Sequence, residues 1–184
     1  MDREPQLDEL YREILIDHGR HPHNFGVLPG ANVVGEGQNP ICGDELSIAL
    51  RFTDDRVSEA RFRGRGCTIS QASASMLTDA VVGRTAGELA SLIEAAEAML
   101  RGEALATPQL GDLETLQSVA RFPARVKCAL LAWKVLRRAL AQQAGLPNPE
   151  PPASVGPRPV PGKPAIRPSP RLATWQPAPR RIGE

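Results

Sequence analysis

The chain has 184 residues, with 22 basic and 21 acidic side chains, a net charge of +1 at pH 7 and only 4% aromatic residues. This length predicts one domain of ordinary size, and the balanced charge and scarce aromatic rings argue against a nucleic-acid partner. No apolar run approaches the roughly 20 residues that span a bilayer, and the acidic, polar N-terminus is unlike a signal peptide, so we expect a cytoplasmic protein with no membrane partner.

The first part of the chain predicts one helix followed by three strands. Apolar residues recur at helical spacing over residues 7–14, and the Gly, Pro and Asn of the segment HGRHPHNFG should end that helix. Extended segments are predicted around residues 31–35, 46–52 and 57–65, the last two joined by a Thr-Asp-Asp turn. A small antiparallel meander fits this pattern.

The second part of the chain predicts helices. After the third strand the apolar period lengthens, which predicts a helix that ends near Gly83. A Thr-x-x-Glu capping box at residues 85–88 opens a second helix, which ends at Gly102. A short helix should begin at Asp112, and Pro123 suits the first position of a last helix that runs to about residue 145. One leading helix, three strands and then helices indicate an α+β fold with segregated layers.

Proline sets the domain boundary. Twelve of the 18 prolines lie in residues 147–184, a segment that cannot sustain a helix or a sheet. We therefore expect a folded domain over residues 1–146 and a Pro-rich, disordered basic tail over residues 147–184. The tail carries a charge of +4 and the rest of the chain −3, so loose attachment to the body or a partner, with Trp175 as the anchor, is the alternative.

Three cysteines and one aspartate are the candidate metal ligands. Cys42 and Asp44 lie in NPICGDEL, at a turn before a strand, Cys67 lies in GRGCTIS just ahead of a helix, and Cys128 lies on the second turn of the last helix. Three thiols and a carboxylate make a four-ligand set for a tetrahedral metal. Their spacing is a weak signal, and buried free cysteines that pack as small hydrophobes are the commoner outcome. The neighbouring glycines favour ligands that approach one ion from turns.

Three histidines are also potential zinc ligands. His18, His21 and His23 lie at the end of the first helix and in the turn that follows. Capping and packing are the favoured roles, because three cysteines and an aspartate already complete a four-ligand set.

Four segments of the chain resemble the IscU/NifU-like iron–sulfur cluster assembly family. NPICGDEL, GRGCTISQASASMLTDAV and FPARVKCALLAWKVL resemble its three cysteine motifs, and YREILIDHGRHPHNFG resembles its N-terminal segment, so that residues 7–140 are covered. GDLETLQSVARFP is similar to part of the insertion of the SufU branch. Lys127 and FPARVK stand where the IscU branch has a histidine and its LPPVK sequence. The resemblance is therefore to the SufU branch.

The resemblance implies both a fold and a function. The fold is the IscU-like sandwich, in which a small three-stranded antiparallel sheet packs against about five helices. The function is that of a zinc-dependent sulfurtransferase that takes persulfide sulfur from a SufS-like cysteine desulfurase and supplies the downstream Suf machinery for iron–sulfur cluster assembly. Zn²⁺ would be held by Cys42, Asp44, Cys67 and Cys128.

Two residues are the candidate catalytic groups. Cys42 is the predicted nucleophile, because it lies on a turn beside glycine whereas Cys67 and Cys128 are anchored at helix starts. Arg125, one helical turn before Cys128, could stabilise a persulfide or a partner carboxylate, or could be an ordinary surface arginine.

Two other functions stay open. The same ligands could bind iron or a [2Fe–2S] cluster as an assembly scaffold, although Lys127 and the insertion argue against this. The metal could also serve only to fold a non-catalytic adapter.

Overall fold

One sheet and five helical segments make up the described part of the chain. The structure is a computed structural model that describes residues 4–144, with side chains from residue 9 onward. The predicted tail at 147–184 and the predicted boundary before it lie outside these residues. The elements in chain order are α1 (Glu4–Arg20), β1 (Val33–Asn39), β2 (Asp44–Thr53), β3 (Arg56–Arg65), α2 (Thr68–Val81), α3 (Ala86–Leu100), the 3₁₀ segment η1 (Pro108–Arg121) and α4 (Pro123–Gln143).

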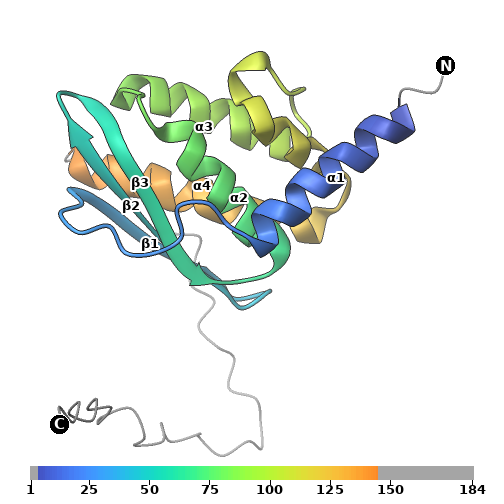
Figure 1. Ribbon diagram of the computed structural model, residues 1–184, viewed down its shortest axis with the longest axis horizontal. Coiled ribbons are helices and arrows are strands. Elements are labelled where there is room, and N and C mark those ends of the chain that lie inside the picture. The colour runs from blue at the N-terminus through green and yellow to red at the C-terminus, as the bar shows by residue number, and fades with distance from the viewer. Residues whose placement is uncertain (1–3, 145–184) are drawn as a thin grey trace, which may run out of the picture. The chain divides into compact units, whose positions relative to one another are not determined.

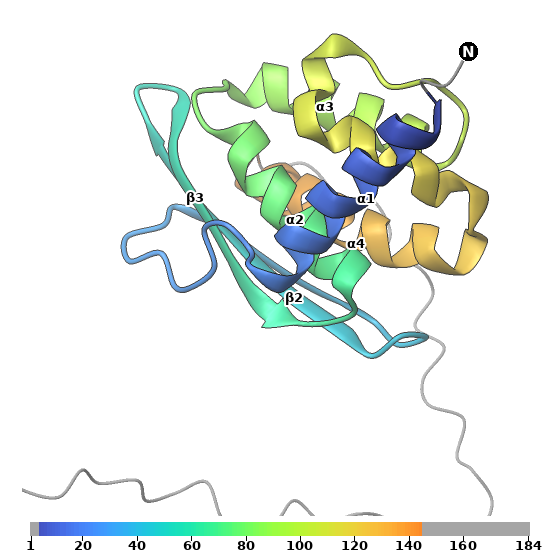
Figure 2. The same ribbon diagram turned by 45° about the vertical axis from the view of Figure 1, so that its right-hand side comes forward.

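The sheet is an antiparallel meander with β2 in the centre. β1 pairs with β2 from Val33 opposite Leu50 to Asn39 opposite Asp44, and β3 pairs with the other edge of β2. Every second residue of β2 from Asp44 to Leu50 is buried, because the helices cover only one face of the sheet (Figure 1 and Figure 2). Alternation of apolar and polar residues in the sequence follows from this one-sided burial.

α4 approaches the sheet closely because β1 carries two glycines on its inner face. A Cβ atom built on Gly35 would lie 2.8 Å from the Cβ of Ala139, and one on Gly37 would overlap Cγ2 of Val135. Real side chains do not pack at such distances. The two glycines therefore allow α4 to pack closely against β1, the strand that leads into the β1–β2 turn.

Trp133 joins α4 to α2 in the core. Its side chain is fully buried, and its Nε1–H donates to the Ser73 hydroxyl at 3.2 Å. The Ser73 hydroxyl in turn donates to the carbonyl oxygen of Ala129 at 2.7 Å. Each polar atom of this buried pair is thus satisfied, which fixes the position of α4 relative to α2.

The segment between α3 and α4 differs from the prediction. The short helix expected from Asp112 is a longer 3₁₀ segment that begins at Pro108, with a break at Gly111, where φ is 52°. Buried apolar residues recur in it at intervals of three, and this period matches a helix with three residues per turn. These residues are Leu110, Leu113, Leu116 and Val119.

The other elements agree with the expected class. The α+β prediction, with a three-stranded antiparallel sheet and five helices, is confirmed. The first strand lies at Val33–Asn39 instead of residues 31–35, because its pairing with β2 continues to the turn. The capping box is present, with the Thr85 N–H donating to Glu88 at 2.7 Å. None of the helices within residues 4–144 has the length and apolar character needed to cross a bilayer.

Gly37→Ala is expected to lower the free energy of unfolding by about 1–3 kcal/mol, because the added methyl group must displace Val135 or push α4 away from β1. Gly87→Ala is the matched control. A Cβ there meets nothing within 4 Å, and alanine is a better helix former than glycine in α3. Urea denaturation of both variants measures the difference, and equal stability would contradict the close packing.

Candidate metal centre

The turn between β1 and β2 exposes Cys42 and buries Asp44. Asn39 organises this turn: its carbonyl oxygen accepts from the Gly43 N–H at 2.8 Å, and its Oδ1 accepts from the Ile41 N–H at 3.3 Å. Gly43 has a φ of 72°, in the left-handed region that favours glycine. The sequence NPICGD therefore forms a tight turn with the thiol at its tip and the carboxylate at its inner end.

Asp44 is fully buried, and only one of its carboxylate oxygens is paired within the described part of the chain. Oδ1 accepts from the backbone N–H of Cys67 at 2.9 Å. Gly66 leaves room for this contact, since a Cβ there would lie 2.9 Å from Oδ1. Oδ2 is buried and has no hydrogen-bond partner among the described residues. An unpaired buried carboxylate oxygen is costly, so this atom marks a place for a cation.

Cys67 is the N-cap residue of α2, directly before its first residue, Thr68. Its backbone is extended, with φ −67° and ψ 163°, and its thiol is exposed. The N-terminus of α2 therefore faces the Asp44 carboxylate through the Cys67 N–H. The helix dipole stabilises negative charge on this carboxylate and on the Cys67 sulfur.

Cys128 brings the third thiol from α4, and it is only 2% exposed. Its Sγ lies 2.9 Å from the Sγ of Cys42 and accepts from the Asn39 side-chain amide at 3.6 Å. Pro123 suits the first turn of α4, because the missing N–H would have no partner there. Asn39 thus contacts both the turn that carries Cys42 and the thiol on α4.

The ligand atoms of Cys42, Asp44 and Cys128 all lie within 4.8 Å of one another. Burial raises the pKa of the Cys128 thiol most, and the neighbouring Cys42, Asp44 and Cys67 raise it further. Crowded thiols and a carboxylate can ionise together only if a positive charge compensates them. The donor set of thiols with one carboxylate, together with the unpaired Asp44 oxygen, fits zinc.

The structure places the remaining predicted residues as follows. The cluster of ligand atoms contains Cys42, Asp44 and Cys128 but not the thiol of Cys67, the fourth predicted ligand. Cys67 contacts the Asp44 carboxylate through its backbone N–H, and Cys67 is among the groups that raise the pKa of the Cys128 thiol. Arg125 is exposed, and its guanidinium lies 4.9 Å from the centre of the Phe122 ring. Sequence reasoning missed Asn39. The Asn-Pro pair just before Cys42 was the available signal, because asparagine side chains commonly organise such turns.

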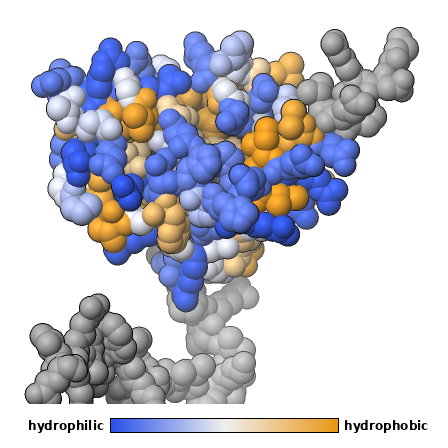
Figure 3. Space-filling model, in the orientation of Figure 1, coloured by the Kyte–Doolittle hydropathy of each residue, from blue (hydrophilic) through white to orange (hydrophobic). Residues whose placement is uncertain are grey.

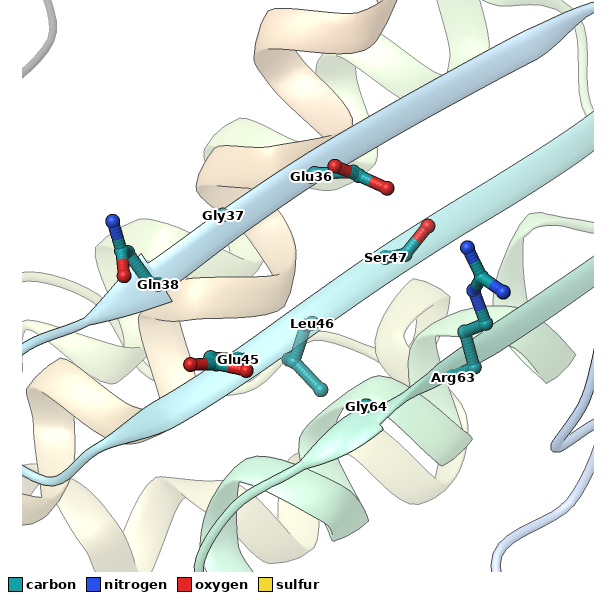
Figure 4. A pocket seen from close by; sticks show the side chains of 8 residues that line it. All are labelled: Glu36, Gly37, Gln38, Glu45, Leu46, Ser47, Arg63 and Gly64. Carbon is teal, nitrogen blue, oxygen red and sulfur yellow. The ribbon is translucent and has the colours of Figure 1, made fainter. Parts of the chain in front are cut away.

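A separate hollow of about 480 Å³ lies on the uncovered face of the sheet (Figure 4). Glu36, Ser47 and Arg63 point into it from three different strands. Its lining contains neither a thiol nor a histidine, so the hollow is not where the predicted chemistry takes place.

Comparisons with known proteins agree on one family. Residues 10–145 match the family described as the NifU-like N terminal domain. The chain is 42% identical over 140 residues to the zinc-dependent sulfurtransferase SufU of Bacillus subtilis, covering 76% of this chain and 95% of that protein. It is 41% identical over 140 residues to the iron–sulfur cluster assembly scaffold protein IscU of Streptococcus pyogenes, covering 76% and 87%.

A solved structure extends the comparison to the fold. The crystal structure of an iron–sulfur cluster assembly scaffold protein for the SUF system from Fervidobacterium islandicum matches with a TM-score of 0.64 and 35% identity. The match covers 70% of this chain and 94% of that one.

Asp44→Ala is expected to lower the zinc bound per chain about tenfold or more, because it removes the carboxylate and leaves the Cys67 N–H without its acceptor. Glu45→Ala is the matched control: Glu45 is the next residue on β2, exposed and paired with Arg65 at 3.1 Å. The zinc bound per chain is measured for both variants by elemental analysis, after gel filtration in a buffer that contains a weak chelator. Equal zinc in the two variants would exclude Asp44 as a ligand.

Proposed function

The chain belongs to the family of NifU-like N-terminal domains, and we propose that it is a zinc-dependent sulfur-transfer protein of iron–sulfur cluster assembly. One observation carries the proposal: the exposed thiol of Cys42 lies against the buried thiol of Cys128, beside a buried Asp44 oxygen that has no partner within residues 4–144. A reactive thiol and a binding site for a cation thus occupy one place.

Cys42 acts as the sulfur acceptor. It lies at the tip of a turn, where the persulfide of another protein can reach it, whereas Cys128 is buried on α4. The Cys42 thiolate attacks the outer sulfur of the donor persulfide and forms a new S–S bond. The S–S bond of the donor breaks, and its electron pair leaves on the donor cysteine as a thiolate. The reaction is redox-neutral, and Cys42 carries the sulfur as a persulfide until a second acceptor attacks it.

The zinc would be held by Cys42, Asp44, Cys67 and Cys128. When bound, zinc supplies a redox-inert positive charge that keeps the thiols deprotonated near neutral pH. The Asn39 amide donates to the Cys128 sulfur and so stabilises its thiolate form. The carboxylate of Asp44 replaces a fourth thiolate, which makes this donor set harder than a Cys₄ site.

A SufS-like cysteine desulfurase is the donor, and the downstream Suf machinery receives the sulfur. Docking of the donor is supported by exposed apolar side chains on the two segments that carry Cys42 and Cys128. On the face seen in Figure 3, several hydrophobic patches interrupt a mainly hydrophilic surface. Ile41, directly before Cys42, is 67% exposed, and Phe122, beside the start of α4, is 50% exposed. Aromatic residues are enriched where proteins dock, so Phe122 is a candidate contact for the donor.

Arg125 assists the sulfur transfer from the exposed side of α4. It lies one helical turn before Cys128, and its guanidinium rests over the Phe122 ring on the exposed side of α4. From there it can pair with the anionic persulfide on Cys42 or with a carboxylate of the desulfurase. This role requires the side chain to leave Phe122 when the partner docks.

Cys42→Ser is expected to abolish the acceleration of a cysteine desulfurase and to prevent any mass increase by one sulfur atom on the chain. The fold should persist, because residue 42 is an exposed turn position and the buried ligands Asp44 and Cys128 remain. Cys128→Ser is the contrasting variant: it should lose zinc and melt at a lower temperature, since metal binding and folding are linked. Full desulfurase acceleration by Cys42→Ser would mean that another residue accepts the sulfur.

A scaffold for a [2Fe–2S] cluster is the alternative, favoured by the ability of three thiols and a carboxylate to ligate iron. Lys127, directly before Cys128, is exposed and offers no imidazole to a cluster. The segment at residues 111–123, which resembles the insertion of the SufU branch, contributes Leu113, Leu116 and Val119 to the hydrophobic core. It is therefore part of the folded domain.

The purified protein is expected to contain zinc and to be colourless. After anaerobic incubation with iron, cysteine and a desulfurase, it should gain sulfur on Cys42 but retain no visible absorption after gel filtration. Reconstitution with zinc-depleted protein is the control for site occupancy. A stable brown species formed by the zinc-loaded protein would favour the scaffold, and zinc without sulfur uptake would favour a non-catalytic adapter.

A further inference from the structure

A second cluster of potential metal ligands lies where the end of α1 meets α2. His18 lies in the last turn of α1, His23 follows that helix, and Asp79 lies on α2. Their ligand atoms all lie within 4.8 Å of one another. Asp79 is twelve residues after Cys67, which places it about 18 Å farther along the axis of α2 at about 1.5 Å per residue. The cluster is therefore separate from the thiols.

Ser75 holds both histidines. Its hydroxyl oxygen lies 2.8 Å from Nδ1 of His18 and accepts from the backbone N–H of His23 at 2.8 Å. A hydroxyl oxygen has two lone pairs, so it can accept from both groups. When Nδ1 of His18 donates to Ser75, the Nε2 lone pair of the ring is available for a metal.

Asn24 holds the carboxylate. Its side-chain amide donates to Oδ1 of Asp79 at 2.7 Å and to the Thr78 hydroxyl at 3.2 Å. The backbone of Asn24 is left-handed, with φ 54°, so the tight turn after His23 aims this amide at α2. Oδ2 of Asp79 lies 2.6 Å from Nδ1 of His23. A cation would replace the proton that these two atoms share. Asn24 would then orient the Asp79 carboxylate as a metal ligand through its hydrogen bond to Oδ1.

The cluster borders an open cavity of about 270 Å³, lined by His18, Asp79, Asp112 and Arg84 among others. This space can hold water molecules as further ligands, and Asp112 adds negative charge to it. The Arg84 guanidinium is engaged by backbone carbonyl groups, because it donates to Ala80 at 2.7 Å and to Gln109 at 3.2 Å. Two imidazoles, one carboxylate and water suit zinc, cobalt or nickel.

We propose that His18, His23 and Asp79 form a second divalent-cation site, with nitrogen and oxygen donors, that joins α1 to α2. The ion links residues more than fifty positions apart in the sequence, so its binding stabilises the contact between the two helices. The chain then holds two ions of different character, one bound by thiols and one bound without sulfur. This site does not depend on the function proposed for the thiols.

Cobalt titration of the metal-free, reduced full chain distinguishes the two sites. Thiolate-bound Co²⁺ gives intense charge-transfer absorption in the near ultraviolet, whereas Co²⁺ bound by nitrogen and oxygen gives only weak visible bands. We expect two equivalents to bind at micromolar cobalt, only one of them with charge-transfer absorption. His23→Ala and Asp79→Asn should each bind one equivalent and keep the charge-transfer band at full intensity.

His21→Ala is the matched control, because His21 is an exposed histidine of the same segment, paired with Asp17 at 2.9 Å. It should still bind two equivalents. The side chains of His23 and Asp79 are 51% and 43% exposed, so their replacement should preserve the fold, which circular dichroism verifies. Asn24→Ala provides a milder variant that should weaken the second equivalent about tenfold.

The outcomes separate the two sites. A parent chain that binds a single equivalent, with charge-transfer absorption, would overturn the histidine site. A second equivalent that survives in both His23→Ala and Asp79→Asn would also overturn it. Loss of the second equivalent in His21→Ala as well would also overturn it, because binding would then reflect surface histidines in general. Absence of the charge-transfer band would instead contradict the thiol centre and leave the result for the histidine site readable.

Discussion

The burial of one carboxylate, that of Asp44, governs how this protein is built around its thiols. A carboxylate removed from water must be compensated, and here one oxygen is paired with the N–H at the start of α2 while the other has no partner within the described residues. The strand start, Gly66 and the N-terminus of α2 must all stay in place for this contact. The same arrangement creates a local demand for positive charge.

Cys42 and Cys128 differ in exposure, and this difference suits Cys42 to accept sulfur and Cys128 to stay in the centre. Cys128 is buried and receives a hydrogen bond from Asn39, which suits a thiol that stays at the centre. Cys42 is exposed at the tip of a turn that Asn39 also organises. A single asparagine therefore sets both the position of the accessible sulfur and the surroundings of the buried one. The thiol that we propose as the sulfur acceptor can therefore be reached without opening the core.

The sequence predicted what local patterns determine. The α+β class, the capping box at Thr85 and the family resemblance, including the SufU branch, are confirmed. Short-range signals specify helix starts and turns, which is why the turn at Cys42 could be expected. The contact of Asn39 with Cys128 spans 89 positions and exists only because α4 packs on β1, so no local pattern announces it. The 3₁₀ segment from Pro108 was missed because its period of three resembles that of an α-helix over a few residues.

α2 explains how two polar clusters can coexist with a tightly packed core. The helix is buried along most of its length and is built from small residues, so α1, β3, η1 and α4 can all approach it. Serine side chains are small enough for this close packing and still form hydrogen bonds. Ser73 donates to α4, and Ser75 contacts His18 in the last turn of α1 and His23 just after it. Larger polar side chains would force these neighbours apart, and alanine would leave their polar groups unpaired. The serine-rich sequence of α2 is thus the compromise that lets one helix position both the thiol centre at its start and the histidine cluster farther along it.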